Sequence, residues 1–295
     1  MFKFAAVLAG ALAASSAVAM PMSASPVVDV NHLVSRGTVD RASAEWKIHE
    51  SCNGTQRAQI SRGLDDMRKL AEHTVQHILN NPMDEYFVRY FGEEADPAPV
   101  IGYYEQVLFG DKKDALLRCD NPDDNCRLEG WAGHWRGNNA TSETVICDYT
   151  YTSRRSLEQL CAFGFQLAQD NQNLILGADL MHRAFHVPPF VHEKVHHYAD
   201  DYYAVLELAK TNSSAAIVNQ YTLQYFALDV YSRTMVEEGC IGTIAPKVKD
   251  DSHAAPAAAA TTTSAAAAAA SPTAAAAASS DCHTHADGSV HCGSH

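Results

Sequence analysis

Between residues 46 and 245 the apolar positions follow helical periods, which predicts a mainly helical protein. Apolar residues recur every three or four positions over residues 55–79, and this predicts an amphipathic helix that ends before Asn81-Pro82. The same criterion predicts helices over residues 156–168, 175–187, 200–209 and 214–236. Pro188-Pro189 ends the helix at 175–187, because proline cannot continue an α-helix.

One segment has the character of a strand. Residues 144–151 alternate apolar and polar positions and are rich in β-branched and aromatic residues. Gly137-Asn138-Asn139 indicates a turn before it, so we expect a hairpin with residues 128–135. The predicted fold class is therefore α+β and mainly helical, with a small antiparallel sheet.

The composition changes at both ends of this region. Lys3, an apolar stretch and the small residues Ala17-Val18-Ala19 predict a secretory signal peptide over residues 1–19. Residues 20–45 predict a loosely ordered N-terminal segment, and residues 46–245 are long enough for one disulfide-stabilised domain. Residues 246–281 are rich in Ala, Thr, Ser and Pro, which predicts a disordered linker before a Cys/His-rich tail at 282–295.

The charge and the glycosylation motifs agree with a secreted chain. A formal charge of −13 argues against nucleic acid as a partner, since phosphate binding needs clustered Lys and Arg. Acceptor tripeptides for N-glycans begin at Asn53, Asn139 and Asn212.

The eight cysteines divide into a body set and a tail pair. The body set is Cys52, Cys119, Cys126, Cys147, Cys161 and Cys240. In an oxidising compartment we expect three body disulfides, whose pairing the spacing leaves open. Cys282 and Cys292 form either a tail disulfide or part of a metal-binding segment.

Nine of the fifteen histidines lie in two clusters, residues 182–197 and the tail. His182 and His186 are four apart on a predicted helix, so both imidazoles can reach one metal ion. About one such pair is expected by chance from the composition, and we interpret His73/His77 as a solvated helix face.

A tetrahedral site needs a further donor from outside that helix. Three candidates follow Pro188-Pro189, namely His192, His197 and Asp200. Zinc proteases place Glu directly after the first histidine as the general base, whereas this chain has Arg183, which cannot accept a proton. Asp179, four residues earlier on the same helix, is the natural partner of Arg183.

The tail has a second set of donors. His283, His285 and His291 lie between or beside the two tail cysteines, and we expect weak, exchangeable metal capture there. Imidazole binds zinc only when it is neutral, so this capture weakens as the pH falls through about 6 to 7.

Together these motifs resemble the fungal pH-regulated antigens, or zincophores, which include a branch of major allergens. The residues that carry the resemblance are His182-Arg183-Ala184-Phe185-His186, His197-Tyr198-Ala199-Asp200 and the tail. The body is also similar, more distantly, to the deuterolysin zinc peptidases, with Tyr90-Phe91-Gly92 in common, so the resemblance implies a zincin-like domain. It further implies a protein that is secreted or held at the cell surface or cell wall, and that returns extracellular zinc to a transporter on the fungal cell. Contact with host proteins is implied as well.

The favoured hypothesis is a non-catalytic protein that captures zinc. His182, His186 and His197 bind Zn²⁺ directly in this hypothesis, with the tail as a secondary site. Two alternatives remain, an active secreted metallopeptidase and a surface adhesion or immune-evasion protein with a structural zinc site. Since one chain supplies only two or three donors, a homo-oligomer that completes the site across an interface also fits.

Overall fold

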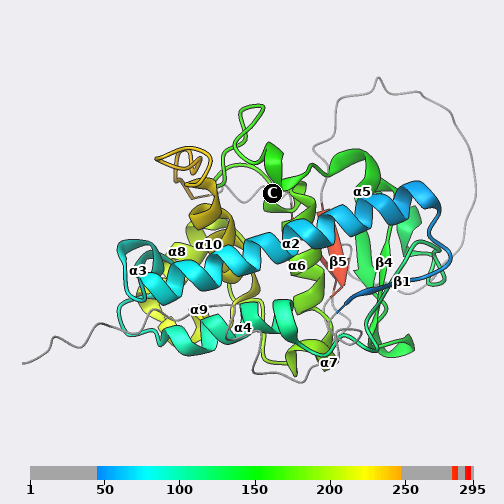
Figure 1. Cartoon of the computed structure of the whole chain (residues 1–295), viewed down its shortest axis with the longest axis horizontal. Helices are drawn as coiled ribbons and strands as arrows, with labels where there is room; N and C mark the ends of the chain where they lie inside the picture. The colour runs from blue at the N-terminus through cyan, green and yellow to red at the C-terminus, as the bar shows by residue number, and fades with distance from the viewer. Residues whose placement is uncertain (1–44, 247–280, 285–289, 294–295) are drawn as a thin grey trace, which may run out of the picture.

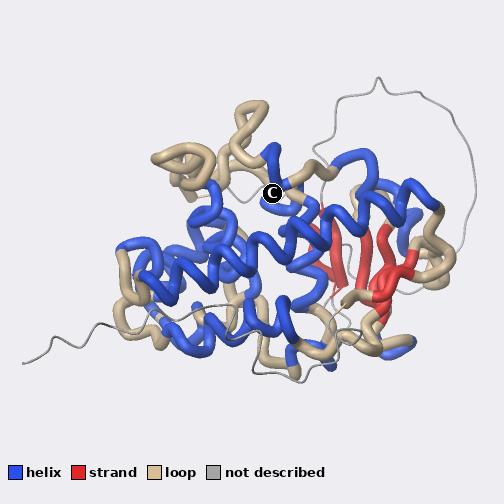
Figure 2. Tube along the Cα trace, viewed as in Figure 1, coloured by secondary structure: helices blue, strands red, loops and turns tan. Residues whose placement is uncertain are grey.

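The computed structural model describes residues 45–246, 281–284 and 290–293, which form a helical body with a small sheet at one end (Figures 1 and 2). The α+β, mainly helical class is confirmed. The predicted signal peptide 1–19 and all but the end residues of the segments 20–45 and 246–281 lie outside the described residues.

The elements follow one another along the chain with short connections. The helices are α2 (Gly54–Asn80), α3 (Glu85–Phe91), α4 (Pro97–Phe109), α5 (Asp148–Ser153), α6 (Leu176–Phe185), α7 (Pro188–Val191), α8 (Tyr202–Thr211), α9 (Ser213–Ala216) and α10 (Gln220–Ser232). The strands are β1 (Lys47–Ile48), β2 (Leu116–Arg118), β3 (Gly133–Trp135), β4 (Glu143–Ile146), β5 (Asp281–Thr284) and β6 (Val290–Gly293).

Helix α2 is the longest helix of the described body and crosses its whole face (Figure 1). It begins at a capping box, in which the side chains of Asn53 and Gln56 each accept a hydrogen bond from the other residue's backbone N–H. Five of the six periodic apolar residues of the predicted helix are buried, namely Ile60, Met67, Ala71, Val75 and Ile78, and Leu64 is partly buried. They pack against α4, α6 and α10, so α2 connects the other helices.

Helix α6 lies unusually close to α2 because glycine lines both sides of the contact. A Cβ atom on Gly63 of α2 would lie 2.6 Å from the Leu176 side chain, and one on Gly177 of α6 would lie 2.8 Å from the Met67 backbone nitrogen. Only residues without a side chain permit this approach. The contact fixes the position of α6, which carries His182.

The sheet is mixed rather than antiparallel throughout, and its strand order is β1-β2-β4-β3. The predicted hairpin is correct, since β3 pairs antiparallel with β4 and places His134 opposite Val145. Strands β1 and β2 pair parallel, as do β2 and β4. Parallel pairing needs a long crossover, which α2, α3 and α4 supply between β1 and β2. Strands β1 and β2, with two and three residues, are too short to show the alternation of apolar and polar residues that predicts a strand.

Two predicted elements are wrong because other contacts of the folded chain override local propensity. The predicted strand 144–151 ends at Ile146, and the chain continues into α5, where Ser153 returns a hydroxyl hydrogen bond to the Tyr149 carbonyl. The predicted helix 156–168 forms only a short 3₁₀ turn, Leu157–Gln159. Cys161 and Phe163 have φ angles of 65° and 55°, which no right-handed helix contains.

The six body cysteines form the three expected disulfides. The pairs are Cys52–Cys119, Cys126–Cys147 and Cys161–Cys240. The third explains the lost helix, because it holds the segment after residue 160 beside residues 240–241, with backbone hydrogen bonds of 2.9 Å and 2.8 Å from the N–H groups of Leu167 and Ala168.

Tyr90-Phe91-Gly92, part of the family resemblance, has an architectural role. The Tyr90 hydroxyl donates to Asp229 at 3.0 Å and contacts the Tyr202 hydroxyl at 2.8 Å, which joins α3, α8 and α10 in the core. Gly92 has a φ of +88°, and a Cβ atom there would lie 2.5 Å from the Ala209 carbonyl oxygen. These residues therefore hold α3 against α8 and contribute no side chain to the histidine cluster described below.

Lys112 is buried at the end of α4 and holds the turn that leads away from α6. Its Nζ donates to the Gly110 carbonyl at 3.0 Å and lies 5.5 Å from the ring centroid of Phe190 in α7. Gln106 donates to the Phe190 carbonyl at 2.8 Å, so α4 holds α7 by two contacts. Burial lowers the pKa of Lys112 to about 8.

This pKa predicts a rise in stability at alkaline pH. Between pH 8 and the ordinary lysine pKa the unfolded chain binds more protons than the folded chain, so the free energy of unfolding increases by up to about 1.4 kcal/mol per pH unit. Denaturant titrations at pH 8, 9 and 10 on the wild type and on Lys112→Met test this expectation. The variant lacks the lysine-specific rise, and equal slopes for both proteins would contradict the assignment.

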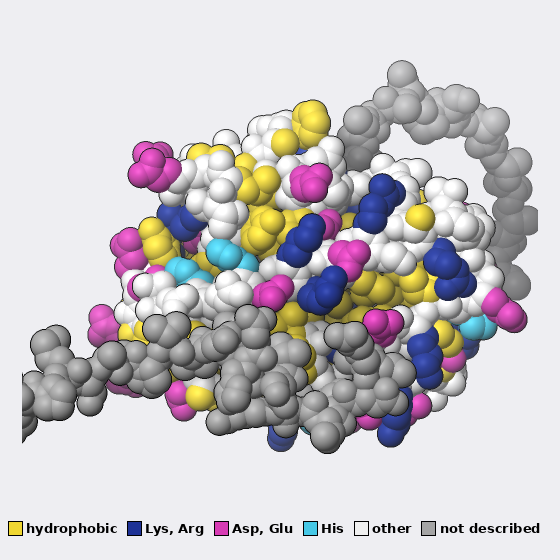
Figure 3. All heavy atoms as spheres, in the orientation of Figure 1, with side chains coloured by type: hydrophobic (Ala, Val, Ile, Leu, Met, Phe, Trp, Pro, Cys, Tyr) yellow, Lys and Arg dark blue, Asp and Glu magenta, His cyan; other side chains and the backbone are white. Residues whose placement is uncertain are grey.

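No helix among the described residues has both the length and the apolar character needed to cross a bilayer. On the face shown in Figure 3, basic and acidic side chains alternate and no large patch of one sign forms. The view thus shows none of the clustered Lys and Arg that a nucleic-acid surface has.

Candidate metal centre

Helix α6 places two histidine rings on one face, in contact with each other. His182 lies in its last turn and is 2 % exposed, and His186 follows directly after Phe185. Their Nε2 atoms are 3.0 Å apart and their ring centroids 4.6 Å apart. The spacing of four residues therefore produces the convergence that the sequence predicted.

The chain then reverses and brings a third imidazole to the same point. After α7, His192 and Glu193 have φ angles of 53° and 57°, and two successive left-handed residues turn the chain back toward α6. The Nε2 atom of His197 lies 3.2 Å from that of His186, and the two rings stack at 4.8 Å.

The structure places the three candidates for the outside donor differently. His197 joins the cluster, while His192 is exposed and has no contact with the cluster among the residues described. Asp200 lies behind His197, with a carboxylate oxygen 3.7 Å from Nδ1. This is the position of a carboxylate that orients a ligating imidazole from behind.

Tyr221 of α10 forms the inner wall of the cluster, and no sequence pattern predicted it. The ring is fully buried, and its centroid lies 5.5 Å from that of His182 and 5.4 Å from that of His197, edge to face in both cases. An aromatic residue in a long apolar helix has no signal that separates it from the core.

Asn219 holds the segment that carries His197. Its Oδ1 accepts hydrogen bonds from the backbone N–H groups of Tyr198 (2.8 Å) and Ala199 (3.2 Å), and its Nδ2 donates to the Ala199 carbonyl (3.0 Å). Backbone hydrogen bonds of 2.8 Å and 2.9 Å also join His196 to residues 218 and 220. The helix predicted over 214–236 is therefore two helices, α9 and α10, because the chain breaks at Asn219 to hold this segment.

Replacing Asn219 is expected to weaken metal binding without touching a donor. Asn219→Ala leaves buried backbone groups without partners, at a cost of about 1–3 kcal/mol in the free energy of unfolding. It also releases His197, so we expect zinc affinity to fall about 10- to 100-fold, as for other residues that orient a ligand. Competition against a zinc chelator measures this. Thr222→Val is the control, since it removes only the Asn219 Nδ2 bond to Thr222 and retains the segment.

Arg183 turns away from the histidines into a buried ion-pair cluster. Its Nη2 lies 3.0 Å from Asp179, which also accepts a hydrogen bond from Arg154 at 3.2 Å, and all three side chains are buried. The partner expected for Arg183 is confirmed. Its guanidinium also lies beneath β3, where a Cβ on Gly133 would approach Nη1 to 2.7 Å.

Two of the three other nearby carboxylates, Asp201 and Glu207, have structural contacts. Asp201 caps α8 by accepting from the Ala204 N–H at 2.8 Å, and Glu207 forms an exposed pair with Lys210. Glu193 is exposed. Among the contacts of the described residues, none joins these three carboxylates to the Nε2 atoms of the cluster.

The donor set fits a zinc ion. Zinc bonds to imidazole nitrogen at about 2.0–2.1 Å, so two donors of a tetrahedral site lie about 3.3 Å apart. The Nε2 separations of 3.0 Å and 3.2 Å are close to this value. Three neutral nitrogen donors suit zinc better than a hard cation such as calcium.

His73 and His77 do not form the solvated face expected from the sequence. The His73 Nε2 lies 3.2 Å from the Val230 carbonyl, and His77 pairs with Asp84 at 3.0 Å. Both rings pack against aromatic side chains of α10. The two histidines therefore hold α2 against α10 and against the start of α3.

The structure describes two strands of the tail and the predicted glycosylation sites. Strands β5 and β6 pair antiparallel, with Cys282 opposite Cys292 and His283 opposite His291, and β5 lies beside β3 (Figure 1). The tail side chains, including that of His285, lie outside the described residues. Asn53, Asn139 and Asn212 are exposed, as glycan attachment requires.

Comparison with known proteins matches the motif at the centre of the cluster. Residues 2–243 match the family described as "HRXXH: Putative peptidase family", and His182-Arg183-Ala184-Phe185-His186 has that pattern. The chain belongs to this family.

Several fungal antigens are similar to this HRXXH protein. It is 48% identical to "Major allergen Asp f 2" of Aspergillus fumigatus over 85% of both chains, and 44% identical to "Antigen 1" of Emericella nidulans over 86% of this chain and 90% of the other. It is 41% identical to "pH-regulated antigen PRA1" of Candida albicans over 70% and 72% of the two chains. A solved zinc peptidase from Grifola frondosa covers 60% of this chain and 96% of its own, at 13% identity and a TM-score of 0.45.

Proposed function

We propose that this HRXXH protein is a secreted zinc-capture protein without peptidase activity. One observation carries the proposal: the Nε2 atoms of His182 and His197 lie 3.0 Å and 3.2 Å from that of His186, while the residue at the general-base position is bound to Asp179. The chain therefore has the donors of a zinc site and lacks the general base that hydrolysis requires.

The three histidines would hold the ion through Nε2, and two of them, His182 and His197, have neighbours that support the ring. Asp200 lies against Nδ1 of His197, and Tyr221 packs edge-on against His182 and His197. A bound zinc ion acts as a Lewis acid toward whatever fills its fourth position. These supports fix the ring orientations before the metal arrives, which favours affinity.

Capture also needs exchange of the ion with solvent, and the partial exposure of two of the rings permits this. His182 is buried, whereas the side chain of His197 is 14% exposed and His186 is partly exposed. An ion reaches the cluster from the His186–His197 side. The inner wall, formed by Tyr221, excludes water from the other side.

A peptidase is the weaker candidate, although the family description names one. A general base must reach the water on the metal, which lies on the Nε2 side of the rings. Asp200 lies on the Nδ1 side of His197, which suits orientation of the ring rather than proton transfer. Arg183 is held by Asp179 and carries no acceptor.

Delivery and location form part of the proposal. The signal peptide over 1–19 sends the chain out of the cell, and residues 282–295 supply a secondary arm with His283, His285 and His291. The arm takes zinc weakly and passes it on to a transporter at the fungal surface. Contact with host proteins and a homo-oligomer that completes the site across an interface stay predictions.

Zinc stoichiometry tests the capture. The full chain, stripped of metal with its disulfides intact, is expected to bind one zinc ion fewer after His182→Ala with His186→Ala, and a matched His73→Ala/His77→Ala variant retains it. Cleavage of unfolded casein is expected to be absent at full zinc loading. Unchanged stoichiometry in the first variant, or chelator-sensitive cleavage, would refute the proposal.

Delivery separates capture from a purely structural zinc site. Zinc-starved fungal cells are expected to regain growth with zinc-loaded wild-type protein and to gain less from the double variant. If chelation collapses thermal stability while delivery is the same for both proteins, the zinc is structural and the adhesion alternative holds.

A further inference from the structure

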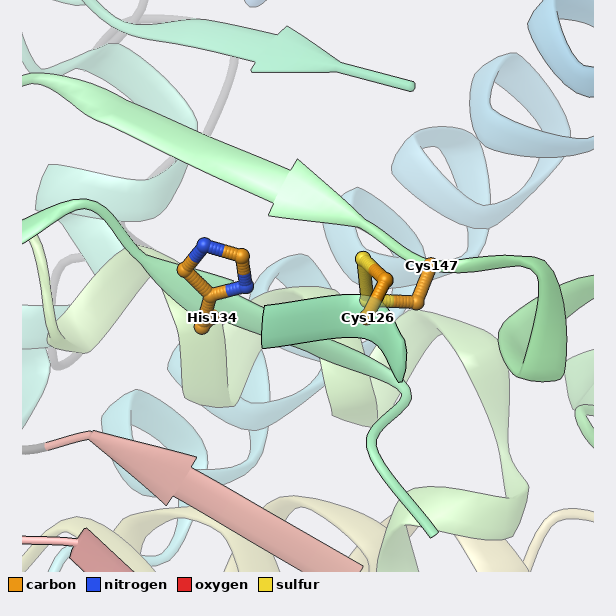
Figure 4. Close-up of side chains that lie close together, drawn as sticks. All are labelled: Cys126, His134 and Cys147. Carbon is orange, nitrogen blue, oxygen red and sulfur yellow. A yellow bond between two sulfur atoms is a disulfide. The ribbon is translucent and has the colours of Figure 1, made fainter. Parts of the chain in front are cut away.

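A second set of donors lies outside the histidine cluster, at the β3 side of the sheet. Cys126 lies in a short 3₁₀ turn, Cys147 follows β4, and His134 lies in the middle of β3 (Figure 4). One ligand atom from each of the three residues lies within 4.8 Å of the other two. The two sulfur atoms are joined as the disulfide Cys126–Cys147.

The backbone around this cluster is firmly held. Strand β3 pairs with β4, and the Cys147 N–H donates to the Ala132 carbonyl at 2.9 Å. His134 and Cys147 are buried, whereas Cys126 is partly exposed. Two donors are therefore fixed by the sheet, and the third lies on a surface turn that can adjust.

The ring of His134 is oriented as a metal ligand would be. Its Nε2 lies 3.2 Å from a carboxylate oxygen of Asp123, and Arg136 donates to the same carboxylate at 2.8 Å and 3.1 Å. Since the carboxylate of Asp123 accepts hydrogen bonds from Arg136, it is the acceptor for His134 too, and Nε2 is the nitrogen that carries the proton. The carboxylate–imidazole pair is the arrangement that supports ligating histidines in metal sites.

The other ring nitrogen, Nδ1, faces the sulfur atoms (Figure 4). It is buried and has no hydrogen-bond partner among the residues that the structure describes, which is costly for a polar atom in the core. Because Nε2 faces the Asp123 carboxylate, Nδ1 is the ring nitrogen that presents its lone pair to the sulfur atoms. A ring held in this way is ready to donate to a cation.

We infer that Cys126, His134 and Cys147 form a second zinc site, which opens when their disulfide is reduced. A dithiol reductant transfers two electrons and two protons, which breaks the S–S bond, gives two thiols and leaves the reductant as a disulfide. Zinc then displaces the two thiol protons and bonds to both thiolates and to Nδ1 of His134. No proton leaves the imidazole, because its N–H is on Nε2.

The change in geometry is small. Two thiolates on one zinc ion lie roughly 3.7 Å apart, since each Zn–S bond is about 2.3 Å. The surface turn at Cys126 supplies this separation while Cys147 and His134 stay in the sheet. Two sulfur donors and one nitrogen donor leave a fourth position open to solvent on the Cys126 side, as three-ligand zinc sites do.

The donor chemistry makes this site distinguishable from the histidine cluster. Co²⁺ bound to thiolates absorbs strongly in the near ultraviolet, whereas Co²⁺ bound only to imidazoles does not. The experiment uses the full chain with Cys282→Ser and Cys292→Ser, so that the tail contributes no thiolate. A phosphine reductant opens the disulfides and becomes the phosphine oxide, and it leaves no competing thiol in solution.

The expected result is one additional Co²⁺ per chain on reduction, together with the thiolate absorption. Cys126→Ser/Cys147→Ser is expected to abolish the additional Co²⁺ and the thiolate absorption. His134→Gln is expected to weaken Co²⁺ binding and to shift the absorption. The control Cys161→Ser/Cys240→Ser is expected to retain the additional Co²⁺ and the absorption. Far-ultraviolet circular dichroism follows the fold, and Co²⁺ is expected to restore any helicity that reduction removes. Absence of the thiolate absorption, its persistence in Cys126→Ser/Cys147→Ser, or helicity that Co²⁺ does not restore overturns the inference. None of these outcomes depends on His182, His186 or His197, so the proposed capture function is tested separately.

Discussion

Arg183→Glu, which restores the helix sequence of a zinc peptidase, is expected to destabilise the protein and to create no peptidase. Arg183 and Arg154 both pair with the buried carboxylate of Asp179. A glutamate in place of Arg183 puts a second negative charge against that carboxylate and leaves the cluster with one cation. Breaking a buried pair in this way costs about 3–5 kcal/mol in the free energy of unfolding.

Urea denaturation and casein cleavage measure the two parts of this expectation. Arg183→Met is the matched control, because it removes the charge, keeps most of the side-chain volume and adds no repulsion, so its loss is expected to be smaller. An Arg183→Glu variant as stable as the wild type, or one with chelator-sensitive cleavage, would show that the side chain at this position faces the metal rather than Asp179.

His197→Ala is expected to reduce zinc affinity by more than about 100-fold. Residues that only orient a ligand contribute 10- to 100-fold, and removal of a donor costs more. The two remaining donors, His182 and His186, lie on one helix and cannot complete a tetrahedral site by themselves. Chelator competition at pH 7.5 gives the affinity.

His192→Ala is the matched control for this experiment. His192 is a histidine of the same reversal, five residues earlier, and it is exposed. The control variant is expected to bind zinc as the wild type does. The reverse outcome, with loss at His192 and none at His197, would mean that the reversal adopts another conformation when zinc binds.

The helical pattern predicted the two helices that position the site, but not the shorter or more apolar elements around them. The predicted helices 55–79 and 175–187 match α2 and α6 to within two residues at each end, because each has a long amphipathic repeat and a clear stop. Helix α3 was missed because it has only seven residues, and α4 because most of its residues are apolar or aromatic and define no polar face. Strands β1 and β2 contribute two and three residues, too few for any periodicity.

For the disulfides, the sequence predicted the number but not the pairing. Their number followed from six body cysteines in an oxidising compartment, whereas their pairing joins residues separated by 67, 21 and 79 positions. Only the fold brings such distant residues together. The pair Cys161–Cys240 also removed a helix that local propensity favoured, because a cross-link to a distant segment outweighs propensities of a few tenths of a kcal/mol per residue.

By itself the sequence determined the helix that carries His182 and His186, the charge at position 183 and the three candidates for the outside donor. Those features depend on spacing within one helix or on the chemistry of one side chain. The tertiary structure alone decided that His197 completes the cluster, that Asn219 holds it there and that His134 faces a disulfide. Each of these depends on where the chain returns after a turn, and that is set by packing between segments far apart in the sequence.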